Sequence, residues 1–127
     1  MKKVLAMALP ILEGQMERAL KFNADLSGER HNEYKAIFSA NGLHERHFLQ
    51  AAPIGDLVVV VLEGENPQES LQKIAHSTDA FSKWYVGEVM ATHGVDLPSA
   101  SMGKLPGLIS DSADTITAES KPGKATA

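Results

Sequence analysis

Leu57-Val58-Val59-Val60-Val61-Leu62 is the stretch that decides the fold of this chain. Six aliphatic residues follow one another here, and β-branched valine favours a strand. A strand with one face in water alternates apolar and polar residues, so an unbroken apolar run predicts cover on both faces of its sheet. The two helical regions of the chain can cover one face. The simplest cover for the other is the same face of a second copy, which predicts a homodimer packed sheet to sheet.

The composition indicates a single domain and excludes chemistry that depends on cysteine. The chain has 127 residues, the usual size of a single domain with a modest core. Its net charge of −4 offers no broad basic surface, so we expect no nucleic-acid partner. Zero cysteines exclude disulfides, thiolate nucleophiles and cysteine-based zinc sites, and they are compatible with a cytoplasmic protein.

The N-terminus resembles a signal peptide only in part. Lys2 and Lys3 precede the apolar residues 4–12, but the chain then continues into Glu13-Gly14 without a small-x-small cleavage pattern. The apolar run is also too short to cross a bilayer. We interpret residues 3–12 as a first strand, and we expect a cytoplasmic protein that does not insert into membranes.

The first half of the chain predicts a strand, a helical region and a hairpin. Residues 14–41 have helical periodicity that Ser27-Gly28 interrupts, which predicts a kink or two consecutive helices. A second strand over 44–52 and a third over 56–63 flank Pro53-Ile54-Gly55, whose proline and glycine are typical of a hairpin turn. The side chains expected to face inward from the helical region are Met16, Leu20, Leu26, Tyr34, Ile37 and Phe38.

Two further helix starts follow the third strand. Asn66 and Pro67 suit the cap and the first position of a helix, with Glu69 three residues after the cap. Asp79 predicts a second start after a short break, and Gly94 predicts the end of that helix. The expected apolar stripe of this last helix consists of Phe81, Trp84, Tyr85, Val89 and Met90.

The resulting order β-α-β-β-α is that of a ferredoxin-like split βαβ fold with an antiparallel sheet, in which one strand is still to be found. Two segments are candidates for the fourth strand, residues 95–97 and residues 105–110, and the second is weakened by its own proline and glycine. We expect an α+β domain over residues 1–97 and a C-terminal extension over 98–127. The extension is rich in small polar residues, and we expect it to pack on the partner subunit.

Four features of the sequence resemble the dimeric α/β-barrel superfamily, in which two ferredoxin-like subunits press their sheets together. They are the run 57–62, the hairpin from Phe48-Leu49-Gln50 to Gly55-Asp56, the pair Phe81-x-x-Trp84 and the helix exit His93-Gly94-Val95-Asp96. The last three are similar to an uncharacterised subset of that superfamily. The resemblance implies a ligand cavity between the sheets. It does not choose a reaction, because the superfamily includes cofactor-free monooxygenases, lactone isomerases, dehydratases and haem enzymes.

The second strand has polar residues at its centre, which points to a role beyond packing. Counting by two, Leu49 and Ala51 share a face suited to overlying helices, which turns Arg46, Phe48 and Gln50 towards the space between the sheets. Arginine there could hold a ligand carboxylate, or it could pair with a Glu or Asp near the strand end while Gln50 spans the dimer interface. The residues expected to contact a ligand are Arg46, Phe48, Gln50, Met7, Val59, Val61 and Trp84.

Two of these assignments depend on orientations that the sequence leaves open. The first strand can turn either Leu5-Met7-Leu9-Ile11 or the smaller Val4-Ala6-Ala8 towards the space between the sheets. Trp84 lies at helical spacing from Phe81, so it can belong either to the core or to the wall of a cavity.

The spacing of the five histidines does not predict a metal site. His44 and His47 are three residues apart on a strand and face opposite sides, and His93 in the last turn of a helix suits a structural role. We expect no metal and no cofactor, and no nucleophile elbow or phosphate-binding loop is present. His47, His93 or Tyr34 could serve acid–base chemistry, but the sequence does not choose a catalytic residue.

The leading hypothesis for function is a binding module. A homodimer would enclose a small hydrophobic molecule, such as a fatty acid or a similar lipid, between its two sheets. The alternative is a cofactor-independent monooxygenase or isomerase that acts on an aromatic or polyketide-like substrate in the same cavity. A third possibility is a structural subunit whose interior is packed solid. Titratable side chains in a cavity would favour the enzyme.

Overall fold

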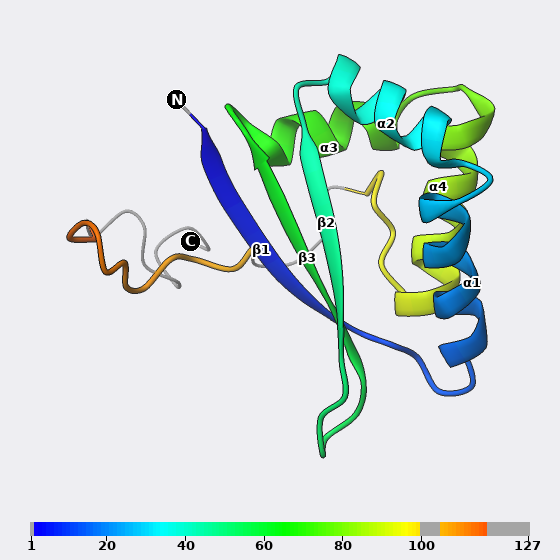
Figure 1. The fold of residues 1–127 in the computed structure, drawn as a ribbon, viewed down its shortest axis with the longest axis horizontal. Coiled ribbons are helices and arrows are strands. Elements are labelled where there is room, and N and C mark those ends of the chain that lie inside the picture. Colours follow the sequence, from blue (N-terminus) through cyan, green and yellow to red (C-terminus); the bar gives the residue numbers. More distant parts are fainter. Residues whose placement is uncertain (1, 100–104, 117–127) are drawn as a thin grey trace.

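The protein is an α+β domain, as the sequence predicts, and its computed structural model describes residues 2–99 and 105–116. Three antiparallel strands form one sheet, and the helices lie against it (Figure 1). In chain order the elements are β1 (Lys3–Pro10), α1 (Met16–Ser27), α2 (His31–Ala40), β2 (His44–Gln50), β3 (Leu57–Gly64), α3 (Pro67–Ala75) and α4 (Ala80–His93). Within the described ranges, none of the helices combines the length and the apolar character needed to cross a membrane.

β3 lies in the middle of the sheet, and both of its neighbours run antiparallel to it in the order β1-β3-β2. Val60 is paired with Met7 on one side and with His47 on the other, so these three residues form one row across the sheet. A central strand is shielded along both edges, which suits the unbroken aliphatic run of β3. This strand order is compatible with the ferredoxin-like arrangement.

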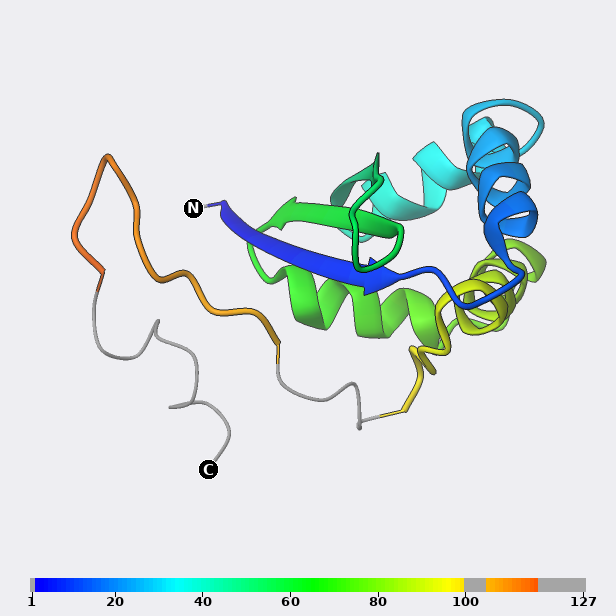
Figure 2. The ribbon, with the colours of Figure 1, turned by 90° about the horizontal axis from the view of Figure 1, so that it is seen from below.

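The two faces of the sheet differ in what covers them. On β3, Val58, Val60 and Leu62 are buried beneath the helices, whereas the alternate side chains are only half-buried on the opposite face. Figure 2 shows α1 and α4 together on one side of the sheet. We call the opposite surface the open face. Its side chains are Val4, Ala6, Ala8, His44, Arg46, Phe48, Gln50, Leu57, Val59, Val61 and Glu63.

β1 resolves an alternative that the sequence leaves open. Its larger residues Leu5, Met7 and Leu9 pack towards the helices and contribute to the core. Its smaller residues, the segment Val4-Ala6-Ala8, are exposed on the open face. A second copy approaching this face would therefore meet a shallow apolar surface along β1.

The helical region 14–41 consists of two helices that separate after Ser27, as predicted. Two inward assignments within the helices are wrong, because Leu20 is 51% exposed and Met90 is 50% exposed. Phe22 takes the inward position on α1 instead and is buried.

The start and end of α4 lie where the sequence predicts them. The Asp79 carboxylate accepts a hydrogen bond from the backbone N–H of Ser82 at 2.9 Å, which caps the helix. Gly94 ends α4 in the left-handed conformation with φ of 71°, which glycine adopts without strain. The cap predicted at Asn66 is wrong in one respect: Pro67 begins α3, but the Asn66 side chain makes no capping hydrogen bond.

The sheet has no fourth strand in the described part of the chain, and the prediction of one at 95–97 or 105–110 is wrong. Both segments have irregular backbone, and Leu105 is the point at which the extension packs partly on the core. One edge of β1 therefore carries no strand among the described residues. Residues 100–104 and 117–127 of the extension lie outside the described residues, and its packing on a partner stays a prediction.

Candidate functional site

Five of the seven predicted ligand residues lie together on the open face. Arg46 is paired with Val61 and Phe48 with Val59 across β2 and β3, and Gln50 follows along β2. Phe48 is half-exposed. In one subunit these side chains form a surface, so a chamber between two sheets would require the second copy.

Met7 and Trp84 lie on the other side of the sheet. Met7 is buried beneath the helices, and the Trp84 ring packs against Phe22 and Phe81, with ring centroids 5.2 and 5.6 Å apart respectively. The guanidinium of Arg30 lies over the Trp84 ring, 4.3 Å from its centroid. Neither residue can line a chamber on the open face. The predicted set therefore divides into five residues on one side of the sheet and two on the other.

Arg46 is already paired across the open face. Its guanidinium donates a hydrogen bond to the carboxylate of Glu63 on β3. That hydrogen bond is the main cause that lowers the pKa of the Glu63 carboxyl group. Desolvation of the carboxyl group acts in the opposite direction. A ligand carboxylate on this face would have to compete with Glu63 for the arginine.

A cleft between α1 and β2 is large enough for a small molecule. Its volume is about 440 Å³, which lies within the range of small-molecule sites. Because β2 is an outer strand, Arg46 and Phe48 of the predicted set also border this cleft. Its lining residues are Ala19, Leu20, Asn23, Leu26, Ser27, Tyr34, Glu45, Arg46, His47, Phe48, Leu49 and Val58.

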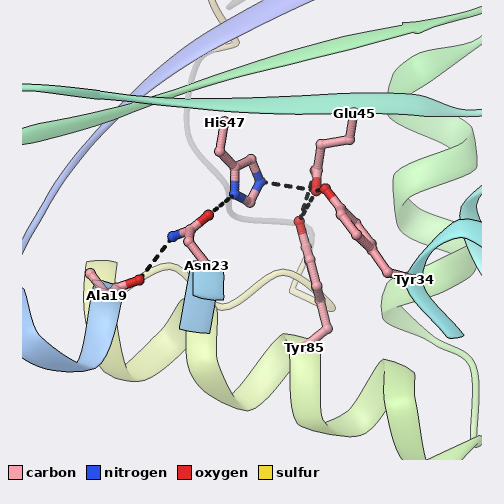
Figure 3. A network of polar contacts seen from close by, with 6 residues as sticks. All are labelled: Ala19, Asn23, Tyr34, Glu45, His47 and Tyr85. Atoms are coloured by element: carbon pink, nitrogen blue, oxygen red, sulfur yellow. Dashed lines mark hydrogen bonds and ion pairs between the residues drawn. The ribbon is translucent and has the colours of Figure 1, made fainter. Parts of the chain in front are cut away.

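The Glu45 carboxylate is the centre of a buried polar network beside this cleft (Figure 3). The Glu45 side chain is only 1% exposed. The hydroxyl of Tyr34 on α2 donates to Oε1 of Glu45 at 2.8 Å, and the hydroxyl of Tyr85 on α4 lies 2.7 Å from both carboxylate oxygens. Buried carboxylates need such donors, since water cannot supply them.

His47 connects this carboxylate to α1. Its Nδ1 lies 2.7 Å from Oδ1 of Asn23, and the Asn23 amide donates in turn to the carbonyl of Ala19 at 2.9 Å. That second bond fixes Oδ1 as the atom facing the ring, so His47 Nδ1 is the donor. His47 Nε2 lies 2.9 Å from Oε1 of Glu45 but makes no hydrogen bond, so this buried nitrogen keeps unused hydrogen-bonding capacity.

The two tyrosines act as donors in this network. Burial is the largest cause that raises the pKa of the Tyr34 hydroxyl, and the Glu45 charge raises it further. The same causes, again led by burial, raise the pKa of the Tyr85 hydroxyl well above its usual value. Both hydroxyls therefore stay protonated at neutral pH, and proton acceptance beside the cleft falls to Glu45 or His47.

The sequence identified part of this network. Tyr34 and His47 are candidate acid–base residues from sequence, and the structure brings both of them to Glu45. Glu45 itself was missed. The available signal was its place on β2: Glu45 shares the inward face of the strand with His47, and an acidic residue on an inward face requires hydrogen-bond partners.

His93, the third acid–base candidate, lies where a structural role is sufficient to explain it. It is buried at the end of α4, and its Nδ1 donates to the carbonyl of Pro10 at 2.8 Å. Burial is the largest cause that lowers the pKa of His93, while the bond to Pro10 opposes it. A small cavity of about 20 Å³ adjoins both His93 and His47, which is room for a water molecule but not for a ligand.

In the described ranges, no three His, Asp or Glu side chains are grouped closely enough to hold a metal ion. The candidate site is therefore the cleft with the Tyr34, Glu45, His47 and Asn23 side chains beside it. This arrangement can accept hydrogen bonds, donate them and exchange protons.

Comparison with models of protein families, with curated proteins and with solved structures finds no match to this chain. The function is therefore argued from the geometry of the site itself.

Proposed function

We propose that this protein binds a small, mainly apolar molecule, and that it does so as a homodimer whose subunits meet through their open faces. The observation that carries the binding proposal is the α1–β2 cleft with a buried polar network beside it. Its volume of about 440 Å³ lies in the lower part of the usual range for small-molecule sites, which favours a compact ligand.

The polar network favours a particular ligand group. A ligand hydroxyl can donate a hydrogen bond to the Glu45 carboxylate or to Nε2 of His47, which is the acceptor nitrogen of the ring because Nδ1 carries the proton. A ligand carboxylate would meet the Glu45 charge at close range, and like charges repel strongly in a buried site. We therefore expect phenols and alcohols with an apolar body to bind in the cleft more tightly than fatty acids do.

A fatty acid held by Arg46 and Gln50 between two sheets stays a separate prediction. That site needs a chamber formed by two copies of the chain, whereas the cleft lies within one subunit. The open face supports the dimer itself. It presents contiguous apolar side chains on β1 and β3, and apolar patches of this kind mark interaction surfaces. A specific interface between two such faces would bury about 1,600 Å² in total.

Filling the cleft is expected to weaken ligand binding. Leu20→Trp places a larger side chain on the α1 wall of the cleft, at a position that tolerates size because it is half-exposed. The affinity for a 4-alkylphenol, measured by titration calorimetry, should fall by about tenfold or more, equivalent to 1.4 kcal/mol or more.

Met90→Trp is the matched control for this experiment. Met90 is exposed to the same degree on α4 and does not line the cleft, so its variant should bind like the unchanged protein. The same titrations should include a fatty acid with the same number of carbon atoms as the alkylphenol. Unchanged affinity in Leu20→Trp, or tighter binding of the fatty acid than of the alkylphenol, would contradict the assignment to the cleft.

Acid–base catalysis on an aromatic or polyketide-like substrate is the second candidate function. The specific observation in its favour is that Glu45 and His47 lie together beside a cleft that an organic molecule could enter. Glu45 or Nε2 of His47 could take a proton from a phenol or a carbon acid, and the same group, then protonated, could return that proton to the product.

His47→Gln and His44→Gln form a pair of variants that tests catalysis. Both residues lie on β2, but His47 borders the cleft and His44 lies on the open face. For an enzyme, His47→Gln should lower turnover of a quinol or lactone by about 10²–10⁴-fold, while His44→Gln keeps it. Absence of turnover by the unchanged protein across the whole substrate panel would reject catalysis of these classes and leave binding as the function.

A further inference from the structure

Residues 106–116 form an irregular arm that leaves the domain and bends at residues 112–114. Leu105 still packs partly on the core, but nearly every later residue of this segment is exposed. Figures 1 and 2 both show the segment leading away from the sheet, on the side opposite α1 and α4. We call residues 106–116 the arm.

The arm carries apolar side chains that its own subunit leaves in water. Leu108 is 54% exposed and Ile109 is 69% exposed, and they are adjacent in the chain. Within the described residues, the arm makes no backbone–backbone hydrogen bond, and the Ala113 N–H donates locally to the Asp111 side chain at 2.8 Å. A segment with few backbone hydrogen bonds and exposed aliphatic residues is typical of chains that order on a partner surface.

The open face is complementary to this arm in two ways. Val4 is exposed with Ala6 and Ala8 along β1, so aliphatic side chains would find an apolar strip with room above it. The charges give a second, smaller match. The arm contains Asp111 and Asp114 and no basic residue, and Lys2 lies at the end of the open face where Arg46 is already paired with Glu63, so the basic side chain offered to the arm is Lys2.

The arm also has a suitable length. β1 has 8 residues, which span roughly 26 Å as a strand. The part of the arm before its bend, residues 106–111, spans roughly 20 Å when extended, so it can follow most of β1 of a neighbouring subunit.

We propose that the arm docks on the open face of a second copy of this chain, with Leu108 and Ile109 packed against Val4, Ala6 and Ala8 of that copy. This inference rests on the proposed homodimer and adds to it a segment exchanged between the subunits. Each arm would then cover the β1 strip of the other subunit, which leaves the β3 and β2 side chains of the open face for the direct contact between the two sheets.

Disulfide trapping tests this contact directly, because the chain has no cysteine of its own. Ala6→Cys is made in one preparation and Ile109→Cys in a second, differently tagged preparation. After mixing and mild oxidation, we expect a disulfide between the two tagged chains, since the bond forms only where the Cβ atoms approach to about 4 Å. A chain that carries both cysteines shows whether the arm instead folds back, because it would then close the bond within one chain.

Dimer dissociation, measured by sedimentation, provides the second readout. Leu108→Asp with Ile109→Asp should raise the dissociation constant by about tenfold or more, because two apolar contacts become charged. Ser110→Asp with Ser112→Asp is the matched control, because it adds the same charge to the arm and keeps both aliphatic residues. This variant should raise the dissociation constant clearly less.

The outcomes separate the arm from the rest of the proposal. A stable dimer whose dissociation is unaffected by Leu108→Asp with Ile109→Asp, and which gives no mixed disulfide, would overturn the arm and leave the dimer standing. An intrachain disulfide without an interchain product would also overturn the arm. A protein that remains monomeric at micromolar concentration would overturn both, whereas binding in the cleft is measured independently by calorimetry.

Discussion

Replacing Glu45 with leucine is expected to lower the free energy of unfolding by about 3–5 kcal/mol. The carboxylate is the acceptor for the Tyr34 and Tyr85 hydroxyls, and Tyr85 is buried while Tyr34 is half-buried. Leucine would leave both hydroxyls without an acceptor, and each unsatisfied buried donor carries a desolvation cost. Urea unfolding monitored by circular dichroism measures the change.

Glu63→Leu is the matched control for this variant. Glu63 lies on the neighbouring strand and also pairs with a basic side chain, Arg46, but that pair is solvent-accessible. Exposed ion pairs contribute little to stability, so Glu63→Leu should unfold close to the unchanged protein. Glu45→Gln keeps one oxygen acceptor and should fall between the two. Equal unfolding free energies for Glu45→Leu and Glu63→Leu would contradict the central place we give to Glu45.

Alkaline pH is expected to destabilise the protein through Tyr34 and Tyr85. Both hydroxyls have a raised pKa in the folded state, for which burial is the main cause. Above about pH 10 the unfolded chain releases these protons and the folded protein keeps them. The folded state then binds more protons than the unfolded state, so its stability falls as the pH rises. The slope is up to about 1.4 kcal/mol per pH unit for each tyrosine.

The double variant Tyr34→Phe with Tyr85→Phe isolates this effect. It should be less stable at pH 7, because Glu45 loses two donors, yet its stability should fall less steeply between pH 9 and pH 11 than that of the unchanged protein. Denaturant unfolding at several pH values gives both slopes. Parallel curves for the two proteins would show that the tyrosines ionise as readily in the folded state as in the unfolded state.

The sequence predicted those helices and strands whose limits are set by residues close to one another in the chain. The six-residue run became the central strand β3, Ser27-Gly28 separates two helices, and Asp79 and Gly94 mark the ends of α4. Each of these signals acts through the residue's own backbone preferences or through contacts within one turn. The expectation at Asn66 shows the limit of this reasoning, since a suitable cap residue can leave its side chain unused.

Long-range contacts account for what the sequence did not predict. Alternation along β2 correctly separated Arg46 from His47, but it could not show that a tyrosine 40 residues after Glu45 would reach that carboxylate. The same alternation offered two orientations for β1, and only the packing of Met7 beneath the helices decided between them. The wrong prediction of a fourth strand also has a long-range cause, because pairing with β1 requires a segment distant in the sequence to lie beside it.

One side chain joins most of this molecule's architecture. Through Glu45 the strand β2 is bonded to α2 and α4, and through His47 and Asn23 it is joined to α1. A guest that forms a bond with this carboxylate must therefore loosen or reinforce links to three helices at once. If a ligand binds in the cleft as we propose, its binding should therefore change the stiffness of the helical layer.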